Sequence, residues 1–102
     1  MIKTGKILAI GEPRPFTNKD GVEMKSYPVT ISVPYVRQDG KKGEDVMICD
    51  HIVGNEAYLK QLEELMESQA ELDMTISFTL RDYNGRLYTN IKLYRISKSI
   101  GV

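Results

Sequence analysis

Apolar and polar residues alternate along the last third of the chain, on both sides of a short polar turn. Residues 74–80 and 87–96 each alternate in character, and the segment between them contains Asn84-Gly85. Period-two alternation across an Asn-Gly pair is the strongest short-range sequence signal for a β-hairpin. The pattern predicts a closing hairpin whose buried residues are Met74, Ile76, Phe78 and Leu80 in one strand and Ile91 and Leu93 in the other.

Three further strand-like runs precede this hairpin, at residues 2–10, 22–36 and 44–53. In the second run, alternation predicts a core-facing set of Tyr27, Val29, Ile31, Val33 and Tyr35. Residues 12–21 hold two prolines and an Asp-Gly pair, which predicts a loop, and residues 37–43 predict a hairpin turn. Gly5, inside the first run, predicts a bulge or a bend.

A single amphipathic helix is predicted after Asn55, whose side chain can cap it by accepting a backbone hydrogen bond. Its apolar residues recur at helical spacing: Tyr58, Leu59, Leu62, Leu65 and Met66. Such a helix is not stable alone, so we expect it to plug an end of the sheet structure. The order of three strands, one helix and a closing hairpin predicts an all-β, five-stranded OB-fold barrel with one helix, built as a single domain from residues 1–102.

Length and composition limit the number of domains, the possible disulfides and the cellular compartments that fit this chain. A chain of 102 residues fits one domain, and Cys49 as the single cysteine excludes an intramolecular disulfide. The sequence shows no signal-peptide pattern and no apolar stretch of membrane-spanning length. We therefore expect a soluble, cytoplasmic protein without a membrane partner.

The net charge of zero hides an uneven distribution. Residues 55–74 contain six acids and one base, so the rest of the chain carries 13 bases and 8 acids. Segregated charge permits a positive face on a neutral molecule, although ordinary surface scatter explains the same counts.

The sequence contains few residues that could form a catalytic or metal site. His51 is the only histidine, and Cys49 shares its strand face, but two ligands do not complete a zinc site. No phosphate-binding loop, dinucleotide fingerprint or nucleophile elbow is present. We expect no enzymatic activity, cofactor, metal or small-molecule substrate. Cys49 is then a small core residue, and His51 caps the end of its strand.

Basic and aromatic residues at the predicted loops fit a surface for unpaired nucleic acid, where cations meet phosphates and rings stack on bases. The candidates lie in the first loop, the second turn and the closing hairpin: Arg14, Phe16, Arg37, Lys41, Lys42, Arg81, Tyr83, Arg86, Tyr88, Lys92 and Tyr94. Some have other interpretations. Tyr88 and Tyr94 also fit contacts with the helix or a second subunit, and Tyr83 could brace its turn.

Residues 2–10 and 78–96, with Tyr83-Asn-Gly-Arg86 followed by an aromatic residue and then Ile91, resemble the DUF3127 family. The resemblance implies a small OB-fold protein, distantly similar to bacterial single-stranded DNA-binding proteins. We expect a non-enzymatic protein that binds single-stranded DNA without strong sequence preference, with micromolar affinity and marked salt dependence. The alternative is an OB-fold structural or protein-interaction module, because fold alone does not fix function. The interaction module would pair with itself or with another protein, and we favour a homodimer because OB-type single-strand binders commonly self-associate.

Overall fold

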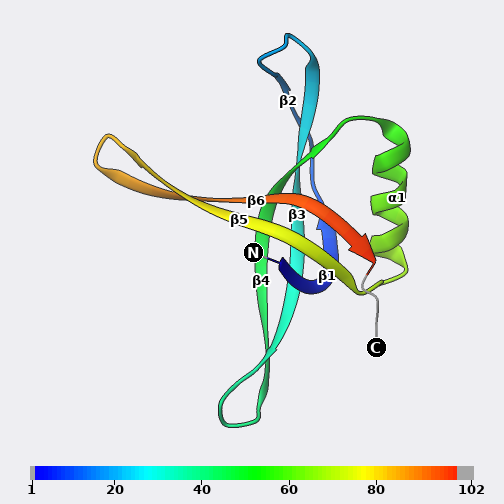
Figure 1. The fold of residues 1–102 in the computed structure, drawn as a ribbon, viewed down its shortest axis with the longest axis vertical. Coiled ribbons are helices and arrows are strands. Elements are labelled where there is room, and N and C mark those ends of the chain that lie inside the picture. Colours follow the sequence, from blue (N-terminus) through cyan, green and yellow to red (C-terminus); the bar gives the residue numbers. More distant parts are fainter. Residues whose placement is uncertain (1, 99–102) are drawn as a thin grey trace.

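The computed structural model describes residues 2–98, apart from the side chains of Arg81, Tyr83 and Tyr88. Within residues 2–98, six strands and one helix follow each other (Figure 1). Their bounds are β1 Ile2–Ile10, β2 Arg14–Thr17, β3 Glu23–Val36, β4 Lys42–Val53, α1 Glu56–Glu67, β5 Leu72–Tyr83 and β6 Arg86–Lys98.

Five of these strands close into a barrel. The hydrogen-bonded order is β1-β5-β6-β4-β3, and β1 also pairs with β3, so the sheet returns to its first strand. The pairs are antiparallel except β4 with β6, which run parallel at Asp50–Lys92 and His51–Leu93. The helix lies in sequence between the third and fourth barrel strands. This arrangement is the OB fold, and the predicted fold class is confirmed.

Closure of the barrel depends on a sharp change of partner at Gly5. Ile2–Gly5 pairs with β5, whereas Lys6–Ile10 pairs with β3. A Cβ atom at Gly5 would lie 2.0 Å from the carbonyl oxygen of Ser32, so the close approach requires glycine here. The bend predicted at Gly5 is therefore present, and a register shift follows it between Ile7 and Ala9.

The core lies inside the barrel and under one face of α1. Its fully buried side chains include Val29, Ile31, Cys49, Leu62, Leu72, Met74 and Ile76. Leu62 is the buried residue of α1, and Tyr58, Leu59, Leu65 and Met66 pack against the core beside it. The backbone N–H of Tyr58 donates to Asn55 Oδ1 over 2.8 Å, which confirms Asn55 as the N-cap.

Two hairpins extend beyond the barrel, and this corrects three predicted core positions. Tyr35 is 38% exposed, Phe78 48% and Leu80 66%. Period-two alternation predicts which face a residue occupies but not where the core ends along a strand. Figure 1 shows the outer ends of the β3–β4 and β5–β6 hairpins projecting from the molecule in different directions. We name residues 35–43 the β3–β4 arm.

The predicted loop at residues 12–21 contains a strand that the sequence reading missed. β2 pairs antiparallel with β3, from Arg14 opposite Ser26 to Thr17 opposite Glu23. Asn18 closes the connecting turn, because its Oδ1 accepts hydrogen bonds from the backbone N–H groups of Asp20 and Val22, both at 2.9 Å. Pro15 is tolerated because β2 is the outermost strand of the sheet, where one backbone edge needs no ladder partner.

Candidate nucleic-acid interface

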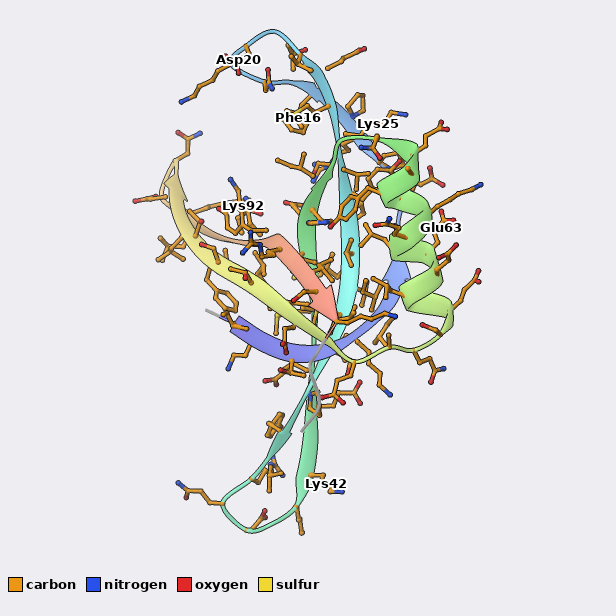
Figure 2. All side chains as sticks on the ribbon, turned by 45° about the vertical axis from the view of Figure 1, so that its right-hand side comes forward. Phe16, Asp20, Lys25, Lys42, Glu63 and Lys92 are labelled. Carbon is orange, nitrogen blue, oxygen red and sulfur yellow. The ribbon has the colours of Figure 1, made fainter. Side chains whose placement is uncertain are left out.

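An open hollow of about 290 Å³ lies where β2 and β3 approach β4 and β6. Phe16 of β2 and Lys92 of β6 lie toward the same open space between the β2 end of the molecule and the β5–β6 hairpin (Figure 2). We name this cavity the β2–β6 hollow, and its lining residues are Phe16, Ser26, Asp50, His51, Ile52, Lys92, Leu93 and Tyr94.

Flat and apolar side chains make up much of this lining. Tyr94 is 60% exposed and Ile52 49% exposed, while Phe16 and Lys92 are half-buried. Strand register explains their meeting. Lys92 pairs with Asp50 of β4, Ile52 of β4 pairs with Ser26 of β3, and β2 lies alongside β3. The hollow thus combines two aromatic rings, an apolar wall and an ammonium group, the parts from which single-strand binding surfaces are built.

Arg14 lies beside the hollow and contacts its acid. The Arg14 Nη2 atom is 3.8 Å from Asp50 Oδ1, and the Arg14 side chain is 80% exposed. An ion pair this long and this exposed contributes little to stability. The Arg14 guanidinium therefore stays available to an incoming anion.

At the floor of the hollow, the buried His51 links β4 to β6 and α1 through two hydrogen bonds of its ring. Its Nδ1 atom lies 2.7 Å from the Leu93 carbonyl oxygen, and its Nε2 atom lies 2.7 Å from the Tyr58 hydroxyl. Because a carbonyl can only accept, Nδ1 carries the proton, and Nε2 accepts from the Tyr58 hydroxyl. His51 is therefore a buried link between β4, β6 and α1, not the strand-end cap expected from sequence.

Burial lowers the pKa of His51, and the hydrogen bond to the Leu93 carbonyl opposes that lowering. Burial also raises the pKa of Tyr58, so its hydroxyl keeps the proton that it donates. The neutral imidazole matches both partners. This link fixes β6 against β4, and with it Lys92 and Tyr94 at the hollow.

The structure divides the predicted site residues into separate groups. Phe16, Lys92 and Tyr94 line the hollow, with Arg14 at its side. Arg86 follows the β5–β6 turn, formed by Asn84 and Gly85 with positive φ angles, and alternation puts it on the same face of β6 as Lys92.

Other predicted residues do not join the hollow. Arg37, Lys41 and Lys42 are exposed in the β3–β4 arm. Lys42 lies at the opposite end of the molecule from Phe16 (Figure 2), along an axis whose extent is 48 Å. These three residues therefore lie apart from the hollow, and a role for them in nucleic-acid binding stays a prediction. The side chains of Arg81, Tyr83 and Tyr88 lie outside the described part of the structure.

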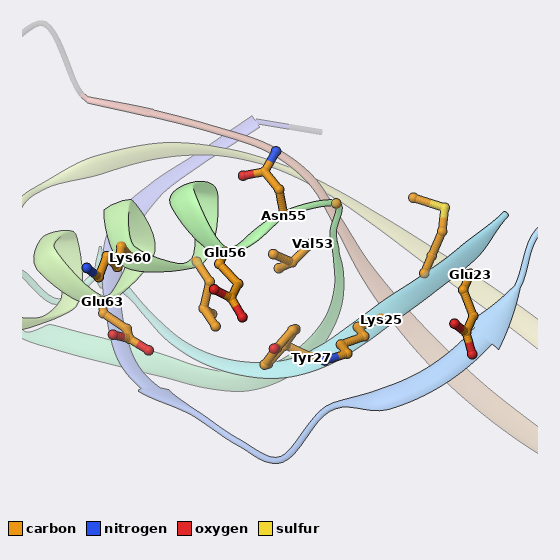
Figure 3. A pocket seen from close by; sticks show the side chains of 11 residues that line it. Glu23, Lys25, Tyr27, Val53, Asn55, Glu56, Lys60 and Glu63 are labelled. Carbon is orange, nitrogen blue, oxygen red and sulfur yellow. The ribbon is translucent and has the colours of Figure 1, made fainter.

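A second and larger cavity, of about 440 Å³, lies between β3 and the start of α1. Figure 3 shows Glu23, Glu56 and Glu63 around it together with Lys25 and Lys60. Three carboxylates against two ammonium groups repel a phosphate chain, in contrast to the β2–β6 hollow. Its size does not make it the nucleic-acid site.

Cys49 packs inside the core, as expected for a small apolar residue. Burial, with the neighbouring charge of Asp50, raises the pKa of its thiol to about 11, so it stays protonated and unreactive. Within residues 2–98, no group of three or more metal-ligating side chains comes together. No helix in that range has the length and apolar character needed to cross a membrane.

Sequence reasoning missed Asp50, Ile52 and Ser26 as lining residues. Asp50 and His51 are neighbours on β4, and neighbours on a strand point to opposite sides. What was missing was β2, since without that strand nothing places Phe16 beside these three positions.

No protein-family model matches the chain, and no curated protein matches it. The resemblance to the DUF3127 family therefore stays a prediction. One similar solved structure is described as Plasmodium falciparum SSB complex with ssDNA; it is 6% identical, covers 92% of this chain and 82% of that one, and has a TM-score of 0.46. At that score the likeness carries no argument about this chain.

Proposed function

We propose that this protein binds single-stranded DNA, with the β2–β6 hollow as the place where unpaired bases stack. The observation that carries the proposal is the meeting of Phe16, Tyr94 and Lys92, from two strands far apart in sequence, around one open cavity. Rings that are partly exposed bind the faces of bases, and every base has such a face.

Cations near the hollow supply the contacts to phosphate. Lys92 lies in the hollow, Arg14 at its side, and Arg86 further along the same face of β6. With two or three phosphates neutralised, the affinity falls about tenfold between about 50 and 200 mM salt, from a slope of roughly −0.7 per phosphate. We expect a dissociation constant in the micromolar range at low salt, because few rings contribute.

Fluorescence anisotropy with a labelled oligo-dT of about 15 nucleotides, at these two salt concentrations, tests the proposal. A duplex of equal length is the control. It should bind more weakly, because paired and stacked bases cannot enter the hollow. Absence of binding to both oligo-dT and oligo-dC at the lower salt concentration would end the proposal.

Exposed apolar residues favour a second function, a protein-interaction module that pairs with itself or with another chain. Val46 is 58% exposed and Ile48 65% in β4, and Leu80 and Leu87 are similarly exposed in the β5–β6 hairpin. Apolar side chains gathered on a surface are typical of protein contacts. Light scattering on the anisotropy samples separates the two functions: a stable dimer without DNA affinity supports the interaction module.

A further inference from the structure

An acid faces the hollow in which we propose that DNA binds. Asp50 lies in β4, opposite Pro28 of β3 on one side and Lys92 of β6 on the other. Its side chain is 31% exposed, and the ionic contact it makes within the described residues is the long one to Arg14. A carboxylate here repels phosphates. We therefore looked for a different group of the DNA strand that Asp50 could bind.

Hydrogen-bond chemistry identifies that partner. An ionised carboxylate only accepts hydrogen bonds, and the phosphates of DNA also only accept them. The donors that an unpaired DNA strand offers are the N–H groups on the edges of its bases. A base stacked in the hollow therefore meets Asp50 favourably when a donor edge is turned toward it.

The four bases differ in those edges. Guanine presents an imino and an amino N–H side by side, which matches the two oxygens of a carboxylate, and cytosine and adenine each present an amino group. Thymine and uracil present one imino N–H between two carbonyl oxygens, and those oxygens repel a carboxylate.

We infer that Asp50 gives the β2–β6 hollow a preference for bases that carry an amino group over thymine and uracil. The inference rests on the proposed function, since it needs a base in the hollow. It replaces the expectation of binding without sequence preference by a preference at this one position, while phosphate contacts and stacking remain indifferent to sequence.

The test compares oligo-dC with oligo-dU of equal length at about pH 7.5, where cytosine is neutral, because these pyrimidines differ at the edge in question and neither carries a methyl group. The unmodified protein should bind oligo-dC about fivefold more tightly or better, the discrimination typical of one good base-edge contact. Asp50→Asn should abolish the preference, because its amide accepts from cytosine and donates to uracil equally well.

Asp45→Asn, the same charge change in an exposed residue of β4 outside the hollow, is the matched control and should keep the preference. If Asp50 merely repels phosphates, Asp50→Asn will tighten binding to both oligonucleotides equally and the inference is overturned. Equal binding of oligo-dC and oligo-dU by the unmodified protein overturns the inference alone. Absence of binding to either removes the proposed function as well, and neither of these two outcomes depends on a variant folding.

Discussion

The β2–β6 hollow and the β3–β4 arm both carry basic residues that were predicted from the sequence to contact DNA. The two regions differ in what surrounds those residues. The arm holds Arg37, Lys41 and Lys42 against one acid, Asp39, and these side chains are exposed. The hollow has fewer cations but adds rings, an apolar wall and a buried support. Local charge density therefore does not by itself identify the surface that we propose, because binding also requires surfaces that meet in space.

The largest effect should come from removing the rings of the hollow. The double variant Phe16→Ala/Tyr94→Ala is expected to weaken oligo-dT binding by about thirtyfold or more, because two rings are removed and stacking contributes about 1–3 kcal/mol per base. Anisotropy titration at low salt measures the change.

Tyr35→Ala is the matched control, since it removes a partly exposed ring from the arm. Its affinity should stay close to that of the unmodified protein. An equal loss in both variants would mean that the DNA path runs over the arm, and the distinction between the two regions would fail.

A smaller effect is expected when the pH is lowered, and it concerns the free energy of unfolding. His51 supports the hollow and not the arm, so its protonation should destabilise the hollow. Burial lowers the folded-state pKa of His51, so the unfolded chain binds more protons below its ordinary pKa of about 6.5. The stability that His51 contributes is therefore fully present above that value and is lost as the pH falls toward the folded-state pKa. The slope should not exceed about 1.4 kcal/mol per pH unit for one proton.

Urea unfolding between about pH 7.5 and pH 5.5 measures this loss. In His51→Gln, whose amide can still donate and accept without titrating, the pH dependence over the same range should flatten. A slope that is unchanged in His51→Gln would assign the titration to other groups.

The smallest effect should come from the arm. Replacing Arg37, Lys41 and Lys42 together by Gln should change oligo-dT affinity less than twofold at physiological salt, because charges separated by more than a Debye length of about 8 Å are largely screened. Lys92→Gln is the comparison and should lose more affinity from a single charge. It should also flatten the salt dependence by roughly 0.7 in slope. A larger loss in the triple variant would reverse the comparison.

Much of the fold followed from local rules in the sequence. Alternation located the barrel strands, Asn84-Gly85 set the last turn, and Asn55 marked the start of the helix. The failures occurred where a strand continued past the core, at Tyr35, Phe78 and Leu80. The period of a pattern indicates a face of the sheet, whereas burial along the strand depends on how far the neighbouring strands reach.

The candidate site was less accessible to prediction, because it depends on register between distant strands. Lys92 and Tyr94 lie in β6 and Phe16 lies in β2, far apart in the sequence. The pairing of β2 with β3, of β3 with β4 and of β4 with β6 brings them together. The prolines and polar residues around β2 predicted a loop instead of a strand, so no neighbours of Phe16 could be predicted. Asp50 gave a signal, an acid on the outer side of a strand, but that signal has meaning only once the opposite wall is known.

The exchange of partners at Gly5 also bears on how the chain reaches its native state during synthesis. The first strand leaves the ribosome early, yet the segment that seals it, residues 72–75, is made about 70 residues later. Until then the nascent sheet has a seam, and the apolar side chains destined for the interior face water or a chaperone. Translation of the final hairpin is therefore the event that completes this domain.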